Sequence, residues 1–129
     1  MDSVSKDSKE YESLKLYAKS RALLLKVYPT FRNFPRIEHR QLCNTIKNSF
    51  EVLLNQIAIA KHVTAVRTRM DACKKAAASL QDLTTWYYVS VEMRYISRGH
   101  YEEVDQRLTE LKKILAGFMK SIGSSRRKP

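Results

Sequence analysis

One uninterrupted stretch in the middle of the chain, from Met70 to Arg98, most constrains the fold of this sequence. It contains neither proline nor glycine, the residues that most often interrupt a helix. Seven residues follow one another at alternating steps of three and four, which places them on one stripe of a helix: Cys73, Ala76, Leu80, Leu83, Tyr87, Ser90 and Arg94. Trp86 and Tyr88 add aromatic surface on further faces, and such helices are usually buried on more than one side. The stretch therefore predicts the central helix of a bundle, ended by Gly99.

The composition favours a single all-helical domain. The chain has 129 residues but only three glycines and three prolines, and sheets with their turns normally need more of both. No apolar run approaches the roughly 20 residues that span a membrane. The first ten residues are polar and mixed in charge, unlike a signal peptide. We therefore expect a cytoplasmic protein.

Three further helices are predicted around the central one. The first ends at Pro29, because proline disfavours the helical conformation in the residue before it. The second begins at Pro35 and carries a narrow apolar seam made of Leu42, Ile46, Phe50, Leu53, Ile57 and Ala60. Between these two helices, Phe31 and Phe34 are expected to cap the end of the core.

The N-termini of the central and last helices are predicted from capping residues and from charge. Thr64 is the expected N-cap of the central helix. The last helix opens at Tyr101 and carries a regular stripe of Val104, Leu108, Leu111, Leu115, Phe118 and Ile122. Gly117 lies within it, where glycine costs about 1 kcal/mol against alanine, which indicates close contact with another helix of this subunit or a second one. Four helices with short connections predict an all-α, antiparallel up-down-up-down four-helix bundle over residues 1–122, with a disordered basic tail over residues 123–129.

No pattern in the sequence predicts catalysis, a metal or a cofactor. The three histidines, His39, His62 and His100, fall at or near predicted helix ends. Neither Glu51 nor Glu92 has the histidine three residues later that di-iron bundles use, and no glycine-rich phosphate loop is present. The two cysteines, Cys43 and Cys73, lie in apolar helical patterns and are expected to be buried. We therefore expect a protein that is not an enzyme.

The charge of the chain predicts a polyanionic partner. Lys and Arg number 24 against 13 Asp and Glu, a formal net charge of +11, which exceeds the magnitude of about 2 to 8 usual for small soluble domains. Nucleic acid is the expected partner, and a merely solvated basic surface is the alternative. The first turns of the central helix hold four cations and only one carboxylate, Asp71, although cations oppose the dipole there. The candidate binding residues are Arg67, Arg69, Lys74, Lys75, Arg94 and Arg98, followed by Lys112, Lys113 and Lys120.

Three segments carry a resemblance to a known family. They are residues 16–35, with Tyr28-Pro29 and Phe34-Pro35, residues 76–91, with Leu80, Leu83 and Trp86, and the pattern Leu108-x-x-Leu111-x-x-x-Leu115-x-Gly117-Phe118-x-Lys120. On these residues the chain resembles the small basic bundle proteins that include the accessory variability determinant (Avd) of diversity-generating retroelements. Relatives of Avd include proteins encoded by intervening sequences of bacterial 23S ribosomal RNA genes. The tyrosine-proline and tryptophan positions favour the Avd branch.

The resemblance implies a non-enzymatic accessory protein. Avd proteins form ring-like homopentamers, bind a retroelement reverse transcriptase and bind nucleic acid, so this chain would support mutagenic reverse transcription through contacts with the enzyme, its template RNA and an RNA/DNA hybrid. Two alternatives stay open. One is a stand-alone RNA-binding bundle of the ribosomal intervening-sequence type, and the other is a structural oligomeric scaffold that does not touch nucleic acid.

Overall fold

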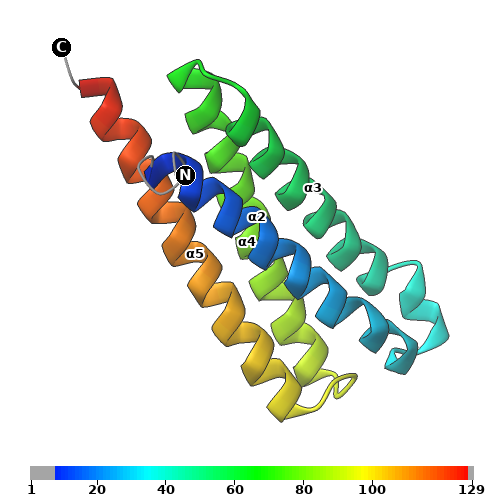
Figure 1. The fold of residues 1–129 in the computed structure, drawn as a ribbon. Helices are drawn as coiled ribbons and strands as arrows, with labels where there is room; N and C mark the ends of the chain where they lie inside the picture. The colour runs from blue at the N-terminus through cyan, green and yellow to red at the C-terminus, as the bar shows by residue number, and fades with distance from the viewer. Residues whose placement is uncertain (1–7, 128–129) are drawn as a thin grey trace.

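The computed structural model describes residues 8–127 and shows four long helices packed side by side (Figure 1). They are α2 (Ser8–Val27), α3 (Leu42–His62), α4 (Val66–Glu92) and α5 (Arg98–Arg127), and the 3₁₀ helices η1 (Tyr28–Asn33) and η2 (Arg36–His39) connect α2 to α3. Consecutive helices run in opposite directions, and each packs against two neighbours, in the order α2, α3, α4, α5 and back to α2. The predicted all-α, up-down-up-down four-helix bundle is therefore confirmed. One end of the bundle carries η1, η2 and the α4–α5 loop, and the other carries the α3–α4 turn.

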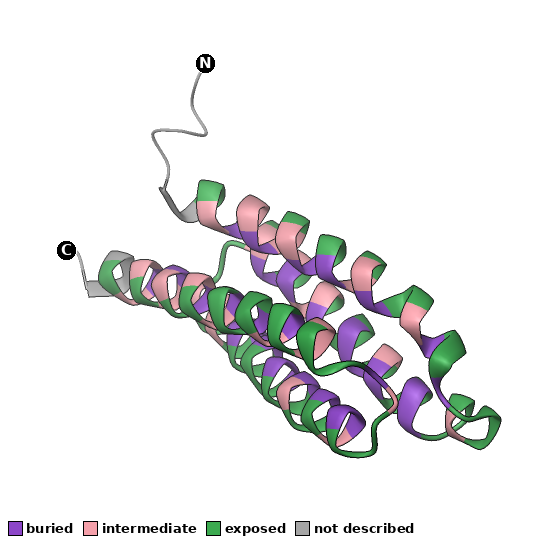
Figure 2. Cartoon of the chain, turned by 90° about the horizontal axis from the view of Figure 1, so that it is seen from below, coloured by how far each residue is buried: buried purple, intermediate pink, exposed green. Residues whose placement is uncertain are grey.

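The core consists of the apolar stripes that the sequence predicts. Figure 2 shows the buried face of each helix turned toward the other helices, with exposed residues on the outside. Every residue of the second-helix seam and of the last-helix stripe is buried, as are Cys73, Ala76, Leu80, Leu83, Tyr87 and Ser90 of α4. Each fully buried leucine, isoleucine or phenylalanine contributes about 1.5 to 3 kcal/mol relative to an exposed one. None of the helices within residues 8–127 is both long and apolar enough to cross a membrane.

Both cysteines are buried, as expected. Burial raises the pKa of the Cys43 thiol and of the Cys73 thiol to about 11. The thiols are therefore protonated near neutral pH and pack as small apolar groups, because only the thiolate is a strong nucleophile or metal ligand.

The end of α4 differs from the prediction. The helix stops at Glu92 rather than at Gly99, and Arg94 adopts a left-handed conformation with φ of 64°. The N–H of Arg94 donates to the Val91 carbonyl and the N–H of Tyr95 to the Ser90 carbonyl, both at 3.0 Å, which is a Schellman closure. Arg94, which the sequence places on one stripe with Cys73 and Leu80, thus follows the helix rather than continuing it, and its side chain is exposed.

Tertiary contacts of Tyr95 explain why the turn forms there. Its ring lies 5.2 Å from that of Phe34, and its hydroxyl donates to Glu38 Oε2 at 3.0 Å. These contacts offset the left-handed conformation of Arg94, which costs about 1 to 2 kcal/mol for a residue other than glycine. Gly99 instead lies in the first turn of α5, which begins at Arg98 rather than at Tyr101.

Three other predicted boundaries are wrong. Pro35 precedes η2 rather than opening α3, since Phe31 and Phe34 are buried and draw the connection across the end of the core. The N-cap of α4 is Ala65 without a side-chain bond, not Thr64, because the chain from Val63 to Ala65 is extended and only the Ala65 carbonyl accepts the first helical N–H, from Arg69. Of the predicted disordered tail over residues 123–129, residues 123–127 belong to α5. No proline precedes Pro129 there, and extending an existing helix needs no new nucleus. Residues 128–129 of that tail and residues 1–7 of the predicted bundle domain lie outside the described residues.

Gly117 makes the close contact expected of it, and the partner is a helix of the same subunit. A Cβ added there would lie 3.2 Å from Glu12 Oε2 of α2. The other oxygen of this carboxylate accepts a hydrogen bond from Ser121 Oγ at 3.2 Å. Gly117 therefore makes room for a polar contact that joins α2 to α5.

A partly buried chain of polar contacts joins η1, α4 and α5. Thr30 donates from Oγ1 to the Val27 carbonyl at 2.6 Å, and the Tyr87 hydroxyl lies 3.3 Å from Thr30 Oγ1 and 2.7 Å from His100 Nε2. Burial raises the pKa of Tyr87 to about 12, so its hydroxyl stays protonated. Burial also lowers the pKa of His100, and the nearby Lys26 lowers it further, so the folded protein favours the neutral imidazole.

We predict that His100 makes the protein less stable in mild acid. Because the folded state holds the lower pKa, the unfolded chain binds more protons, and the contribution of His100 is complete above about pH 6.5 and is lost as pH falls below it. The variant His100→Gln keeps hydrogen-bonding groups but does not titrate. Its melting temperature should fall less than that of the natural protein between about pH 7 and pH 5. An equal fall in melting temperature for the two proteins over this pH range would contradict the prediction.

Candidate nucleic-acid interface

The predicted binding residues of α4 do not form one surface. Arg67 and Arg69 lie in its first turn, beside the end of α3, whereas Arg94 follows its last turn. A helix of 27 residues is about 40 Å long. The structure therefore places Arg94 and Arg98 at the opposite end of the bundle from Arg67 and Arg69 (Figure 1).

Arg69 makes contacts that stabilise the fold. Its Nε donates to the Ala60 carbonyl at 2.9 Å, and its guanidinium lies 5.5 Å from the centre of the Phe118 ring. Ala60 lies in the last turn of α3, where carbonyls lack helical partners and a cation complements the dipole. Arg69 therefore opposes the dipole of α4 but stabilises the C-terminal end of α3. This contact explains why a cation lies in the first turn of α4, and the sequence did not reveal it.

The other predicted cations on the helix faces make only weak contacts with side chains of the protein. Lys75 lies 3.3 Å from Asp71 in a largely exposed pair, which contributes little, and Lys112 Nζ lies 3.4 Å from Gln81 Oε1. Four more are exposed and have no carboxylate within 4 Å among the described residues: Arg67, Lys74, Lys113 and Lys120. They are accessible to an anion, but they are spread along α4 and α5.

Five exposed arginines share the end of the bundle opposite to Arg67 and Arg69, and the sequence analysis missed three of them. We define the basic end as five exposed arginines, Arg32, Arg36, Arg40, Arg94 and Arg98, from η1, η2, the turn before α3 and the α4–α5 region. None of them has a carboxylate within 4 Å in the part of the chain that the structure describes. The sequence did contain a signal for this site. Arg32, Arg36 and Arg40 are spaced four residues apart, and Glu38 is the only carboxylate between Arg32 and Arg40.

Glu38 is occupied by the contacts that build the basic end. Its Oε2 accepts the hydrogen bond of Tyr95, and its Oε1 lies 3.4 Å from the N–H of Leu42 at the start of α3. The bond to Glu38 raises the pKa of the Tyr95 hydroxyl, which stays protonated as the donor. The same contact brings Arg94 and Arg98, on either side of Tyr95, to the end of the bundle where η2 lies.

Carboxylates concentrate on the neighbouring face instead. Glu102 and Glu103 belong to the first turns of α5, and Lys26 of α2 lies 3.0 Å from Glu103. The hydrogen bond and charge of Lys26 lower the pKa of Glu103. Lys19 lies 3.2 Å from Glu110 in the same way. The α2–α5 face is thus locally neutralised, whereas the basic surface is concentrated toward η1 and η2.

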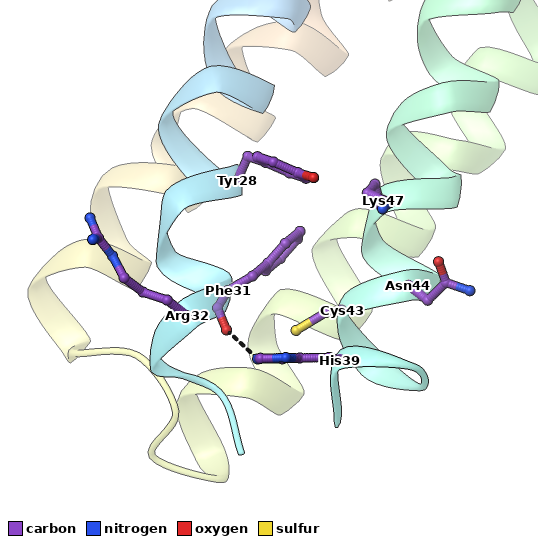
Figure 3. Close-up of a pocket in the computed structure, with 7 residues that line it drawn as sticks. All are labelled: Tyr28, Phe31, Arg32, His39, Cys43, Asn44 and Lys47. Carbon is purple, nitrogen blue, oxygen red and sulfur yellow. Dashed lines mark hydrogen bonds between the residues drawn. The ribbon is translucent and has the colours of Figure 1, made fainter. Parts of the chain in front are cut away.

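A cavity of about 270 Å³ opens between η1 and α3, beside the basic end (Figure 3). Tyr28 and Phe31 line it from η1, and Lys47 lies across from Tyr28 on α3, with its Nζ 5.7 Å from the centre of the Tyr28 ring. The Arg32 side chain points to the outer side of η1. No cluster of three histidine, cysteine or carboxylate side chains suited to a metal occurs in the described residues.

Comparison with known proteins identifies the family. The profile of the 23S rRNA-intervening sequence protein family matches residues 12–117. The chain belongs to this family. The predicted relationship is thereby confirmed at the family level, and the Avd branch stays a prediction.

A solved structure supports the fold. The crystal structure of a protein of unknown function from the S23 ribosomal protein family of Bacteroides thetaiotaomicron superimposes with a TM-score of 0.76. It is 17% identical in sequence, and the match covers 84% of this chain and 98% of that one. No curated protein matches the chain at a significant level.

We predict that Arg69 is a stabilising residue. The variant Arg69→Met leaves the Ala60 carbonyl without its charged donor, so the free energy of unfolding should fall by about 1 to 3 kcal/mol. Arg67→Met removes the same charge from an exposed position and should change it by less than about 0.5 kcal/mol. Urea denaturation of both variants measures the difference, and equal stabilities would exclude this role of Arg69.

Proposed function

We propose that this protein is a non-enzymatic RNA-binding four-helix bundle of the ribosomal intervening-sequence type, which contacts RNA phosphates through its basic end. The observation that carries the proposal is the set of five exposed arginines without carboxylate partners at one end of the bundle. The net charge of +11 supports a polyanionic partner. The name of the matching family refers to 23S rRNA, which makes RNA the preferred polyanion.

Arginine is well suited to this binding mode. Its planar guanidinium donates two parallel hydrogen bonds to a phosphate and stays charged at any physiological pH. Phosphate contacts carry little sequence information and release counterions. The protein should therefore bind RNA with a steep salt dependence and weak sequence preference.

We predict that neutralising part of the basic end weakens RNA binding more than neutralising the faces of the helices. The variant Arg32→Gln/Arg36→Gln/Arg40→Gln should lower affinity for a single-stranded RNA at low salt by tenfold or more. The slope of log affinity against log salt should become shallower by about 2, because each phosphate contact contributes about 0.7 for single strands. Fluorescence anisotropy over a salt titration measures both quantities.

A matched variant separates local contact from overall charge. Arg67→Gln/Lys74→Gln/Lys75→Gln removes three cations from α4, and the net charge changes equally. It should retain most of the affinity and the slope. If this variant loses as much as the basic-end variant, only net charge matters. If the natural protein shows no salt-dependent affinity for RNA, the scaffold alternative is favoured and the proposal fails.

The Avd-type role is a second candidate, and it includes self-assembly. In addition to the resemblance, several large apolar side chains are exposed on the single subunit, including Leu25, Trp86 and Met93. Such side chains suit burial against another subunit or a protein partner. A ring of five subunits predicts a fivefold subunit mass by light scattering in high salt without nucleic acid. Co-purification with a retroelement reverse transcriptase and its template RNA would favour this role over the stand-alone one, and a monomer that binds RNA alone would exclude it.

A further inference from the structure

The cavity between η1 and α3 has the size of a site for one small ring system. Its volume of about 270 Å³ is just below the roughly 300 to 1,000 Å³ of sites for drug-sized ligands. It opens to the surface beside the basic end, and no carboxylate lines it. Its ionisable lining residues are Tyr28, Arg32, His39, Cys43 and Lys47, of which Arg32 points to the outer side of η1 (Figure 3). An anionic ligand with one ring is therefore favoured over a cationic one.

Aromatic surface is accessible at the cavity. Tyr28 is 51% exposed, although its ring contacts the buried Phe31. Its ring lies 5.6 Å from that of Phe31 at 70°, an edge-to-face contact that leaves part of the tyrosine ring uncovered. A flat ring can stack on such a surface.

The polar groups around the aromatic surface suit a nucleotide. His39 Nε2 lies 3.0 Å from the Phe31 carbonyl (Figure 3). Because a carbonyl only accepts, Nε2 carries the hydrogen, which leaves Nδ1 of the neutral ring as an acceptor. The Asn44 side chain offers one donor group and one acceptor. Lys47 supplies a cation at the mouth, with no carboxylate within 4 Å among the described residues.

Cys43 completes the inner wall. Its sulfur points into the cavity (Figure 3). The raised pKa of its thiol keeps the sulfur neutral, so it adds apolar surface without repelling a phosphate.

We propose that this cavity binds a single unpaired base of RNA, stacked against Tyr28 and Phe31, with the adjoining phosphate at Lys47. The inference rests on the proposed RNA-binding function and adds a preference to it. Bases within a duplex are stacked and paired and cannot enter the cavity, whereas bases in loops, bulges and ends can be splayed onto aromatic side chains. The protein should therefore prefer RNA with unpaired nucleotides, while the basic end contacts the neighbouring backbone.

The test compares Tyr28→Ala with a matched aromatic deletion. Tyr11 is 52% exposed and lies near the other end of α2, so Tyr11→Ala removes an equally exposed ring away from the cavity. Affinity is measured by fluorescence anisotropy for a short single-stranded RNA and for a fully paired duplex of the same sequence. Tyr28→Ala should weaken single-strand binding about 10- to 100-fold, the usual effect of losing one base–aromatic stack. It should leave duplex binding unchanged, and Tyr28→Phe and Tyr11→Ala should behave like the natural protein.

Several outcomes would overturn the inference, and they separate its failure from that of the proposed function. If Tyr28→Ala binds single strands normally while the basic-end variant does not, RNA binding stands and the base site is wrong. Equal loss on single strand and duplex also rules out a base site. If Tyr28→Ala changes the mass of the assembly measured by light scattering in high salt, the cavity is instead a contact between copies of the chain. If the natural protein binds no RNA, both proposals fail.

A second measurement does not depend on how the variants fold. Ultraviolet cross-linking of the natural protein to the same single-stranded RNA, followed by mass spectrometry, should attach nucleotide to the segment from Tyr28 to Lys47. The duplex should give no cross-link there. Cross-links confined to other segments would count against the site.

Discussion

Four helices of 20 to 30 residues bury their apolar stripes only if each lies against two others along its length. This constraint moves every connection to an end of the bundle, and because the connections are short, neighbouring helices are antiparallel. Small side chains are also buried on α4, namely Ala72, Ala76 and Ser79, and α4 packs most extensively against α3. Charged residues that cannot be buried in the core can lie in these connections, as the arginines of η1, η2 and the α4–α5 region do.

Polar contacts fix how the ends are closed. Tyr95 bridges Phe34 and Glu38, and the Thr30–Tyr87–His100 chain joins η1 to α4 and α5. Both sets of contacts link the η1–η2 connection to the second half of the chain. The surface that we assign to RNA and the cavity beside it therefore rest on a connection that is held in place by side chains from two other helices.

The helical stripes could be predicted from the sequence because their signal is local. A period of three and four residues is visible in one segment, and the seams of the second and last helices are buried at every predicted position. The helix ends depended on contacts between distant segments. Glycine is the usual residue after a helix, but the contacts of Tyr95 place Arg94 there instead of Gly99. The role of Arg69 likewise depends on Ala60 in another helix.

The candidate interface was harder to predict for the same reason. Arg94 and Arg98 were chosen from one helix together with Arg67 and Arg69, although the fold separates the two pairs by the length of α4. Of their neighbours, Arg32 comes from the connection that was predicted to cap the core, and Arg36 and Arg40 come from the predicted start of the second helix. No local pattern shows that residues 32–40 and 94–98 meet, since the meeting depends on Tyr95 and Glu38.

The kinds of cation at each place give the assignment a chemical basis beyond charge. Lysines make up most of the cations of the helix faces, including Lys19 and Lys26, which neutralise carboxylates of α5. The five residues that define the basic end are arginines, and Lys47 lies at the cavity beside them. Lysine suits a solvated face because it is a flexible, strongly hydrated point charge. Arginine offers a fixed fork of donors that matches a phosphate and a flat surface that stacks on a base. Five arginines next to an open aromatic cavity thus match both parts of a nucleotide, whereas a surface that only kept the protein soluble would need neither.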